Sequence, residues 1–130
     1  MKVLLDTNAC VFFAQEPERL SATALAFIQH VETEVFVSAV STGELACLEQ
    51  RGRLKLSPHW KGWFRRQLDV NGWECLPVSL PIMEEAWSLP EPIHRDPVDR
   101  MLIATARLSD MFLITTDRLI LDYPHVRSLC

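Results

Sequence analysis

The sequence alternates short apolar, β-branched runs with longer stretches in which apolar residues recur at helical spacing. The apolar runs cover residues 2–5, 34–38, 73–78 and 111–115, with a weaker run at 125–129. The helical patterns cover residues 21–31, 41–50, 58–69, 81–89 and 98–108. Strands separated by helices of about ten residues need crossover connections, which produce parallel pairing. We therefore expect an α/β fold, a three-layer α/β/α sandwich with a mostly parallel central sheet.

The length of the chain limits it to one folding unit. With 130 residues it can bury one hydrophobic core but not two ordinary ones, so we treat residues 1–130 as a single domain. No apolar run reaches the ~18 residues of a membrane helix, and the N-terminus lacks the basic and apolar regions of an export signal. We expect a cytoplasmic protein with no membrane contact.

The cysteines and the net charge exclude two other classes of protein. The four cysteines are widely spaced and form no C-x-x-C pair, which favours reduced thiols over disulfides or a structural zinc site. A net charge of −4 argues against a protein that binds duplex nucleic acid mainly by electrostatic attraction. The same net charge is compatible with an enzyme whose acidic residues are concentrated in one pocket.

Four carboxylates are expected at one edge of the sheet. Asp6 directly follows the run at 2–5, Asp117 follows the run at 111–115 after Thr116, and Glu44 lies in the first turn of the helix predicted to begin at Ser41. Asp99 lies in the first turn of a helix that leads into the run at 111–115, so the start of this helix lies over the same edge. Ligands of open parallel sheets bind beyond the carboxyl ends of the strands. The four side chains can therefore converge there.

Each acid also has a structural explanation when it is taken alone. Glu44 fits the third position of a capping box begun by Ser41, and Asp99 stands three residues after Asp96, the expected N-cap of its helix. Asp6 and Asp117 can cap helices as well, but they are harder to explain in this way because both end the most apolar predicted strands. Four such acids on one rim are better explained by a common site than by four separate coincidences.

A cluster of four carboxylates requires a cation. Like charges a few ångströms apart raise one another's pKa, so the ionised cluster needs positive charge for compensation. Oxygen ligands without nearby His or Cys select a hard ion, Mg²⁺ or Mn²⁺. Mg²⁺ takes one or two carboxylates directly and keeps positions for water and phosphate oxygens. This arrangement is typical of metal-assisted phosphodiester hydrolysis.

Four motifs give the chain a family resemblance. They are LLDTNA (4–9), SAVSTGEL (38–45), HRDPVDRMLIATA (94–106) and LITTD (113–117). In this order, and over the whole length of the chain, they resemble the PIN-domain nucleases and, among these, the VapC-like toxins of bacterial type II toxin–antitoxin pairs. The third motif is the most specific of the four.

The resemblance implies roles for individual residues. Asp6, Glu44, Asp99 and Asp117 take the acidic positions of the family as catalytic residues and metal ligands, with Asp6 and Asp99 as the direct ligands. Glu44 and Asp117 would act directly or through water. Supporting positions fall on three further residues: Asn8 would brace Asp6, Thr116 would hold a water, and Arg100 would pair with an acid or contact a phosphate. An ordinary exposed ion pair is an equal alternative for Arg100, and Asp122 is read as a surface acid near the site.

The resemblance also implies a reaction and partners. The family hydrolyses RNA with Mg²⁺, for which Mn²⁺ can substitute, and a metal-activated water leaves a 5′-phosphate and a 3′-hydroxyl. Its members usually form homodimers and are held inactive by a cognate antitoxin protein, in some cases within a larger toxin–antitoxin assembly. Apolar residues around positions 45–48 and 60–64 are candidates for these protein contacts.

A basic stretch supplies candidate RNA contacts. Arg51, Arg53 and Lys55 are positioned to hold backbone phosphates, although a solvated helix end explains each of them equally well. The aromatic residues Trp60, Trp63 and Phe64 recur at helical spacing, which favours packing over stacking on bases.

Two rival functions remain open at the level of sequence. The first is a phosphatase-like or phosphotransfer domain with Asp6 as a nucleophile. It predicts a second acid at position 8, which is Asn, and a lysine at the end of a late strand, which the chain lacks. The second is a catalytically inactive PIN-like binding module, against which the four intact acids count.

Overall fold

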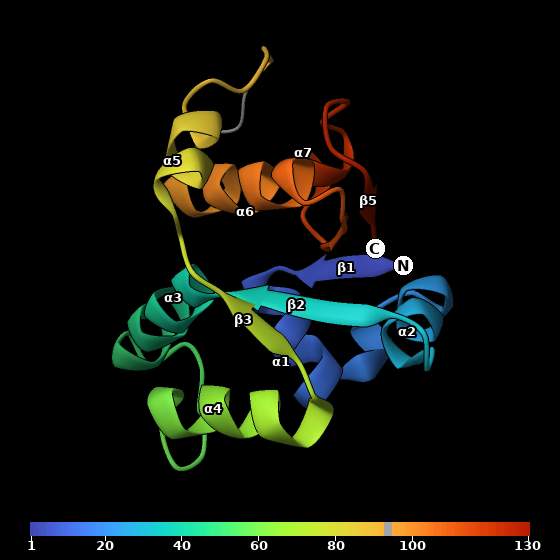
Figure 1. Ribbon diagram of the computed structural model, residues 1–130. Coiled ribbons are helices and arrows are strands. Elements are labelled where there is room, and N and C mark those ends of the chain that lie inside the picture. Colours follow the sequence, from blue (N-terminus) through green and yellow to red (C-terminus); the bar gives the residue numbers. More distant parts are fainter. Residues whose placement is uncertain (93–94) are drawn as a thin grey trace.

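The computed structural model describes residues 1–92 and 95–130, and its centre is a five-stranded sheet (Figure 1). The strands are β1 (Lys2–Leu5), β2 (Glu34–Ser38), β3 (Glu74–Leu76), β4 (Phe112–Ile114) and β5 (Ser128–Leu129). Every pairing is parallel, and the spatial order is β3-β2-β1-β4-β5. The chain builds outward from β1 to β2 and β3, then crosses to β4 and β5 on the other side. The strand order therefore reverses between β1 and β4.

Helices cover both faces of the sheet, which confirms the predicted three-layer α/β/α sandwich (Figure 1). They are α1 (Thr7–Gln15), α2 (Ala22–Gln29), α3 (Ala39–Gln50), α4 (Trp60–Asn71), α5 (Leu80–Ala86), α6 (Pro97–Leu108) and α7 (Arg118–Leu121), with a 3₁₀ turn at Pro17–Arg19. Side chains of α1 to α4 form one hydrophobic cluster with the sheet. Those of α6 and α7 form a second cluster on the opposite face, and α5 packs on α6.

The strands alternate between the two clusters, as the two-residue period of a strand requires. Val3 and Leu5 of β1 join the cluster of α1 to α4, whereas Leu4 between them joins the cluster of α6 and α7. All three are fully buried. Because both faces of β1 carry apolar side chains, this strand lies in the middle of the core. Asp6, which follows Leu5, is therefore at the edge of the core.

The predicted start of α3 is wrong, two helices were missed, and several strands are shorter than predicted. Helix α3 begins at Ala39 with Ser38 as its N-cap, not at Ser41, because the Ser38 hydroxyl accepts a hydrogen bond from the Val40 amide at 3.1 Å. Glu44 therefore lies in the second turn. Helices α1 and α7 were not expected. The runs at 73–78, 111–115 and 125–129 contain strands of only three, three and two residues.

Two further findings bear on the class of protein. Among the described residues, none of the helices is both long and apolar enough to cross a bilayer. All four cysteines are free thiols, of which Cys10 is buried and Cys47 and Cys130 are exposed. His94, the first residue of the third sequence motif, lies outside the described residues.

Candidate functional site

The candidate site lies at the carboxyl edge of the sheet, at the point where the strand order reverses. Asp6 directly follows β1, and Asp117 follows β4 after two threonines. The β1 and β4 strands are paired, with Leu5 opposite Ile114, and the Asp6 amide donates to the Ile114 carbonyl at 3.1 Å. Such reversal points are where open parallel sheets bind their ligands. The predicted location of the acids at this edge agrees with the topology.

Asp6 is buried at the end of β1 and is both a helix cap and a charged group in the core. Only 6% of the residue is exposed. Its Oδ1 accepts a hydrogen bond from the Ala9 amide at 2.7 Å, which caps α1, and its carboxylate is also hydrogen-bonded to the Thr115 side chain. Burial is the main cause that raises the pKa of Asp6, and the charges of Glu44 and Asp117 also raise it. The two hydrogen bonds lower it, and the net pKa is about 6.

Asp99 is brought to the same edge by the first turn of α6. The helix begins as predicted, with the Asp96 carboxylate accepting from the amides of Val98 and Asp99 and with Pro97 at the first position. The pKa of Asp99 is raised to about 7, mainly by burial. The charges of Asp96, Asp117, Glu44 and Asp6 contribute to this value, in that order of size. Asp99 therefore interacts electrostatically with each of the other three predicted site acids.

Glu44 and Asp117 complete the acidic group from two further helices. Glu44 is half-buried on α3, which contacts both α1 and α6. Asp117 caps α7 by accepting from the Leu119 amide at 2.9 Å, and its own amide donates to the Thr115 hydroxyl at 3.0 Å. The charges of Glu44 and Asp117 raise the pKa values of both Asp6 and Asp99. The fold thus brings together all four acids that the sequence predicts.

Buried hydroxyls support this edge, and the sequence interpretation missed them. The Thr7 hydroxyl donates to the Ser41 hydroxyl at 2.9 Å and ties the start of α1 to α3. Thr115, which is fully buried, is hydrogen-bonded to the carboxylate of Asp6 and accepts from the amide of Asp117. These three residues join the elements that carry Asp6, Glu44 and Asp117.

The predicted supporting residues lie around the acids in a different arrangement. Thr116 is exposed, and its buried neighbour Thr115 makes the hydrogen bonds at the site. Asn8 is exposed on the first turn of α1, while Ala9 and Thr115 make the hydrogen bonds that orient Asp6. Arg100 is half-buried, with its guanidinium carbon 5.6 Å from the centre of the Trp87 ring. Its predicted role toward an acid or a phosphate stays a prediction.

The remaining candidates lie farther out. Asp122 is an exposed acid 3.9 Å from Arg118, which agrees with its reading as a surface residue. Arg51, Arg53 and Lys55 are exposed in the connection after α3. The expectation of packing is confirmed for Trp63 and Phe64, which are buried in the core.

The same burial corrects one expectation about partner contacts. Leu45, Trp63 and Phe64 belong to the hydrophobic core, so they are not available as protein-docking residues. Trp60 and Leu48 are half-buried.

As they stand, the side chains do not outline a complete metal cage. Within residues 1–92 and 95–130, no three His, Cys, Asp or Glu side chains are arranged to hold one ion. The group does have two acids with raised pKa values, the buried Asp6 and the half-buried Asp99, flanked by two more carboxylates. Such a set favours whatever brings positive charge to it, either protons or a cation with oxygen ligands.

Comparison with known proteins gives a consistent family result. The profile of the family described as PIN domain matches residues 3–126. Ribonuclease VapC22 of Mycobacterium tuberculosis (strain ATCC 25618 / H37Rv) is 31% identical over 125 residues, which make up 96% of this chain and 94% of that protein.

Solved structures share the fold over almost the whole chain. VapBC2 from Rickettsia felis, bound to a DNA fragment from their promoter, matches with a TM-score of 0.73 and 15% identity, covering 98% of this chain and 97% of that chain. A toxin–antitoxin complex from Klebsiella pneumoniae matches with a TM-score of 0.65 and 18% identity, covering 98% and 96%. At these identities the likeness concerns the fold alone.

Proposed function

The chain belongs to the PIN domain family, and we propose that it is a Mg²⁺-dependent endoribonuclease and the toxin of a type II toxin–antitoxin pair. The ribonuclease activity in the name of the VapC22 relative supports the choice of RNA as substrate. The observation that carries the proposal is the meeting of Asp6 and Asp99 with two further acids at the reversal point of the sheet. Burial and neighbouring carboxylates raise the pKa values of both.

A divalent ion with oxygen ligands fits these residues. Mg²⁺ usually takes one or two carboxylates directly and fills its other positions with water, so it does not need three protein ligands in place beforehand. Asp6 and Asp99 would hold the ion directly, and Glu44 and Asp117 would hold it directly or through water. Mn²⁺ would substitute because it accepts the same ligands. The ion supplies positive charge that offsets the phosphate and lowers the pKa of water.

The chain's own groups orient the reactants and move the proton. The Ala9 amide and Thr115 fix the carboxylate of Asp6, so it does not need to reorganise when substrate arrives. Glu44 or Asp117 accepts a proton from the attacking water. The new bond forms between this water oxygen and phosphorus, and the bond to the 3′ oxygen breaks. The products are a 5′-phosphate and a 3′-hydroxyl, which takes up a proton.

Helix N-termini favour a phosphate at the same place. Helices α1, α3 and α6 start at or over the carboxyl edge, with Asp6, Ser38 and Asp96 as their N-caps. The positive ends of their dipoles therefore point toward the edge where an anionic substrate would lie.

The biological part of the proposal follows the relatives. Solved structures with this fold include VapBC and other toxin–antitoxin complexes, which supports a cognate antitoxin as partner. We expect the toxin to act in the cytoplasm as a homodimer, free or within a larger toxin–antitoxin assembly. Its induced expression should then arrest growth, and co-expression of the cognate antitoxin should restore it.

A cleavage assay on structured RNA tests the proposal. Purified protein should cleave with Mg²⁺ or Mn²⁺ and stop when EDTA is added, and the products should carry 5′-phosphates. The Asp99→Asn protein should be folded by circular dichroism but inactive, because one direct ligand of the ion has lost its charge.

Other outcomes of the same assay would reject the proposal. Cleavage that continues in EDTA, or in folded Asp99→Asn protein, removes the metal-dependent assignment. A covalent phosphate on Asp6 would favour the phosphatase-like rival. Antitoxin binding without any cleavage would favour the inactive binding module.

A further inference from the structure

The basic residues of the chain are concentrated in one short segment. Residues 51–66 contain six of the 13 lysines and arginines and no aspartate or glutamate. The rest of the chain carries the other seven cations and all 17 acids, so its net charge is −10. RNA approaching this protein meets mostly like charge. A positively charged path to the acidic edge would offset that repulsion.

The basic segment is held in place by an acid of α3. Both oxygens of Glu49 accept backbone hydrogen bonds from the segment, from the amide of Leu56 at 3.2 Å and from that of Trp60 at 3.0 Å. Leu56, Trp63 and Phe64 are buried in the core beneath it. The cations are therefore displayed on an anchored surface, which limits the entropy lost when a ligand binds.

A groove runs between α3, α4 and β3 beside two of these cations. It has a volume of about 470 Å³, and its lining includes Ala39, Thr42, Trp60, Lys61, Phe64 and Arg65. Lys61 and Arg65 are four residues apart, which places them on one side of α4. The Lys61 ammonium lies 5.5 Å from the centre of the Trp60 ring. The groove thus combines an apolar floor with a row of positive charge.

The groove starts next to the acidic site. Ala39, in its wall, is the residue after Ser38, where β2 ends. Strand β2 pairs with β1 so that Leu5 is opposite Val37, and the following residues, Asp6 and Ser38, are therefore neighbours at the carboxyl edge. Paired strands are about 4.8 Å apart. In Figure 1, α3 and α4 lie on the same side of the sheet, beside β3.

We infer that this groove binds a single-stranded part of the RNA substrate next to the cleaved bond, with Lys61 and Arg65 on backbone phosphates and the apolar floor under a base or ribose. Aromatic and apolar surface beside cations is the usual means of holding single-stranded nucleic acid without reading its sequence. The inference rests on the proposed function, because it names where that substrate lies. An acidic protein segment is the competing occupant, and RNA is favoured because the groove starts at the same carboxyl edge of the sheet as the acids that would cleave it.

Matched substitutions test the inference. Binding of a fluorescein-labelled single-stranded RNA is measured by anisotropy on Asp99→Asn protein, and cleavage on otherwise wild-type protein. Adding Lys61→Gln and Arg65→Gln should weaken binding about tenfold and reduce the slope of log affinity against log salt by roughly 1.4, for two lost phosphate contacts. The control is Arg66→Gln, an exposed cation next to Arg65 that is not part of the groove lining. It should change affinity less than about twofold.

The outcomes separate this inference from the proposed function. If wild-type protein does not cleave RNA at all, the proposed function fails. If wild-type protein cleaves but the Lys61→Gln/Arg65→Gln protein binds RNA as tightly as the Arg66→Gln protein, the groove is not an RNA site and the inference is overturned. Unchanged RNA binding combined with loss of antitoxin binding in the Lys61→Gln/Arg65→Gln protein would assign the groove to a protein and also overturn it.

Discussion

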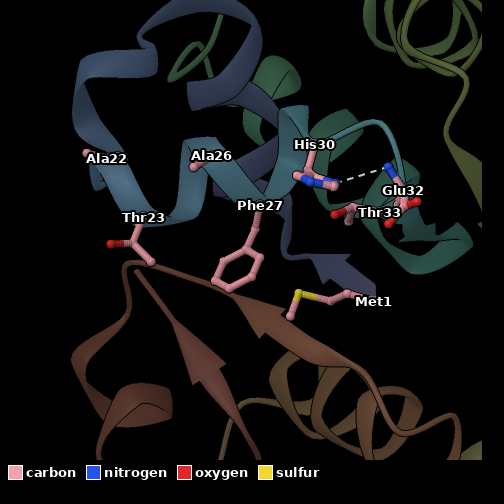
Figure 2. A pocket seen from close by; sticks show the side chains of 8 residues that line it. All are labelled: Met1, Ala22, Thr23, Ala26, Phe27, His30, Glu32 and Thr33. Atoms are coloured by element: carbon pink, nitrogen blue, oxygen red, sulfur yellow. Dashed lines mark hydrogen bonds between the residues drawn. The ribbon is translucent and has the colours of Figure 1, made fainter.

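The two edges of the central sheet are lined by different kinds of side chain, polar at one edge and apolar at the other. The carboxyl edge contains five of the buried polar residues, Asp6, Thr7, Ser38, Ser41 and Thr115. The opposite, amino edge has an apolar pocket of about 550 Å³ next to α2 (Figure 2). There the Phe27 ring and the Met1 side chain project into the space between α2 and the end of the sheet, and the Glu32 amide donates to His30 at 3.1 Å. The 550 Å³ apolar pocket and the group of acids are therefore at opposite ends of the strands.

This difference shows that the size of a hollow is a poor guide to chemistry in this fold. Burying a carboxylate costs free energy, and an α/β core has no structural need for one. The carboxyl edge nevertheless keeps Asp6 only 6% exposed and places other acids near it. A buried carboxylate surrounded by other acids destabilises the fold, so its presence is better explained by function than by packing.

The largest expected difference between the edges is in catalysis. Replacing Asp6 by Asn removes the charge of a proposed metal ligand while keeping the shape and the acceptor for the Ala9 amide, so RNA cleavage should fall by a factor on the order of 100 to 1,000 or more. The matched change at the amino edge is Glu32→Gln, which also removes one carboxylate charge. It should leave the rate of RNA cleavage within about twofold.

A single set of cleavage time courses with equal amounts of folded protein checks both variants. Near-wild-type activity in Asp6→Asn would mean that the buried acid is only a helix cap. An equally large loss in Glu32→Gln would mean that the two edges are not functionally distinct.

The second difference is in stability against pH. The pKa of Asp6 is about 6 in the folded protein and 3.8 for an unperturbed aspartate, so between these values the folded state binds more protons than the unfolded chain. The contribution of Asp6 to the free energy of unfolding should therefore fall as pH rises through this window, by up to roughly 3 kcal/mol. Asp99 acts in the same direction up to about pH 7, with a smaller effect because it is more exposed.

Urea denaturation from pH 4 to 8, with and without Mg²⁺, measures this contribution. The Asp6→Asn protein should be relatively more stable than wild type above about pH 6, and Mg²⁺ should stabilise wild type most at the same high pH. Parallel pH curves for the two proteins would show that Asp6 has no raised pKa. A Mg²⁺ effect of equal size in both would place the ion elsewhere.

Local signals in the sequence were sufficient for part of the fold. Helix α6 was predicted because Asp96 and Pro97 together form a strong start signal, and its end at Leu108 was also correct. Helix α1 was missed because Thr7–Gln15 continues the apolar run of β1 without a polar face. A helix buried on most sides has no amphipathic period to detect.

The start of α3 shows a second limit. Ser38 and Ser41 are both good N-caps, and either could begin the helix on local grounds. The structure uses Ser38, which frees the Ser41 hydroxyl to accept from Thr7, a contact across 34 positions in the sequence. Contacts of that kind are set by packing, so the sequence did not reveal them.

The acids of the candidate site were easier to predict than their supports. The parallel topology alone brings the ends of β1 and β4 together, so Asp6 and Asp117 meet whatever the details of packing. The choice between Thr115 and Thr116 depends on which hydroxyl points inward after a three-residue strand. Adjacent residues with the same side chain give no local signal for that choice.

The third difference concerns the buried hydroxyl pair at the carboxyl edge. Thr7→Val or Ser41→Ala removes one partner of a buried 2.9 Å hydrogen bond and should lower the free energy of unfolding by roughly 1–2 kcal/mol each. The double variant should lose less than the sum of the two, with a coupling of about 1 kcal/mol. Chemical denaturation of the four proteins gives this coupling. Strict additivity would show that the two hydroxyls do not act together in holding α1 to α3.

The smallest expected effect belongs to the amino edge. Phe27 lines its pocket and stacks on Phe112 of β4, with ring centres 6.2 Å apart and planes tilted by 14°. Phe27→Leu keeps most of the apolar surface but loses the ring contact, so stability should fall by about 1 kcal/mol or less. Phe112 is three residues before Thr115, which is hydrogen-bonded to Asp6. If the two edges were mechanically coupled through β4, the substitution would therefore change the rate of cleavage. We expect the rate of RNA cleavage to stay within about twofold of wild type, because Phe27→Leu is a conservative apolar change whose contact is at the start of β4, away from the acids that follow its end. A clear loss of cleavage at normal stability would show that the apolar pocket and the acidic edge form one functional unit.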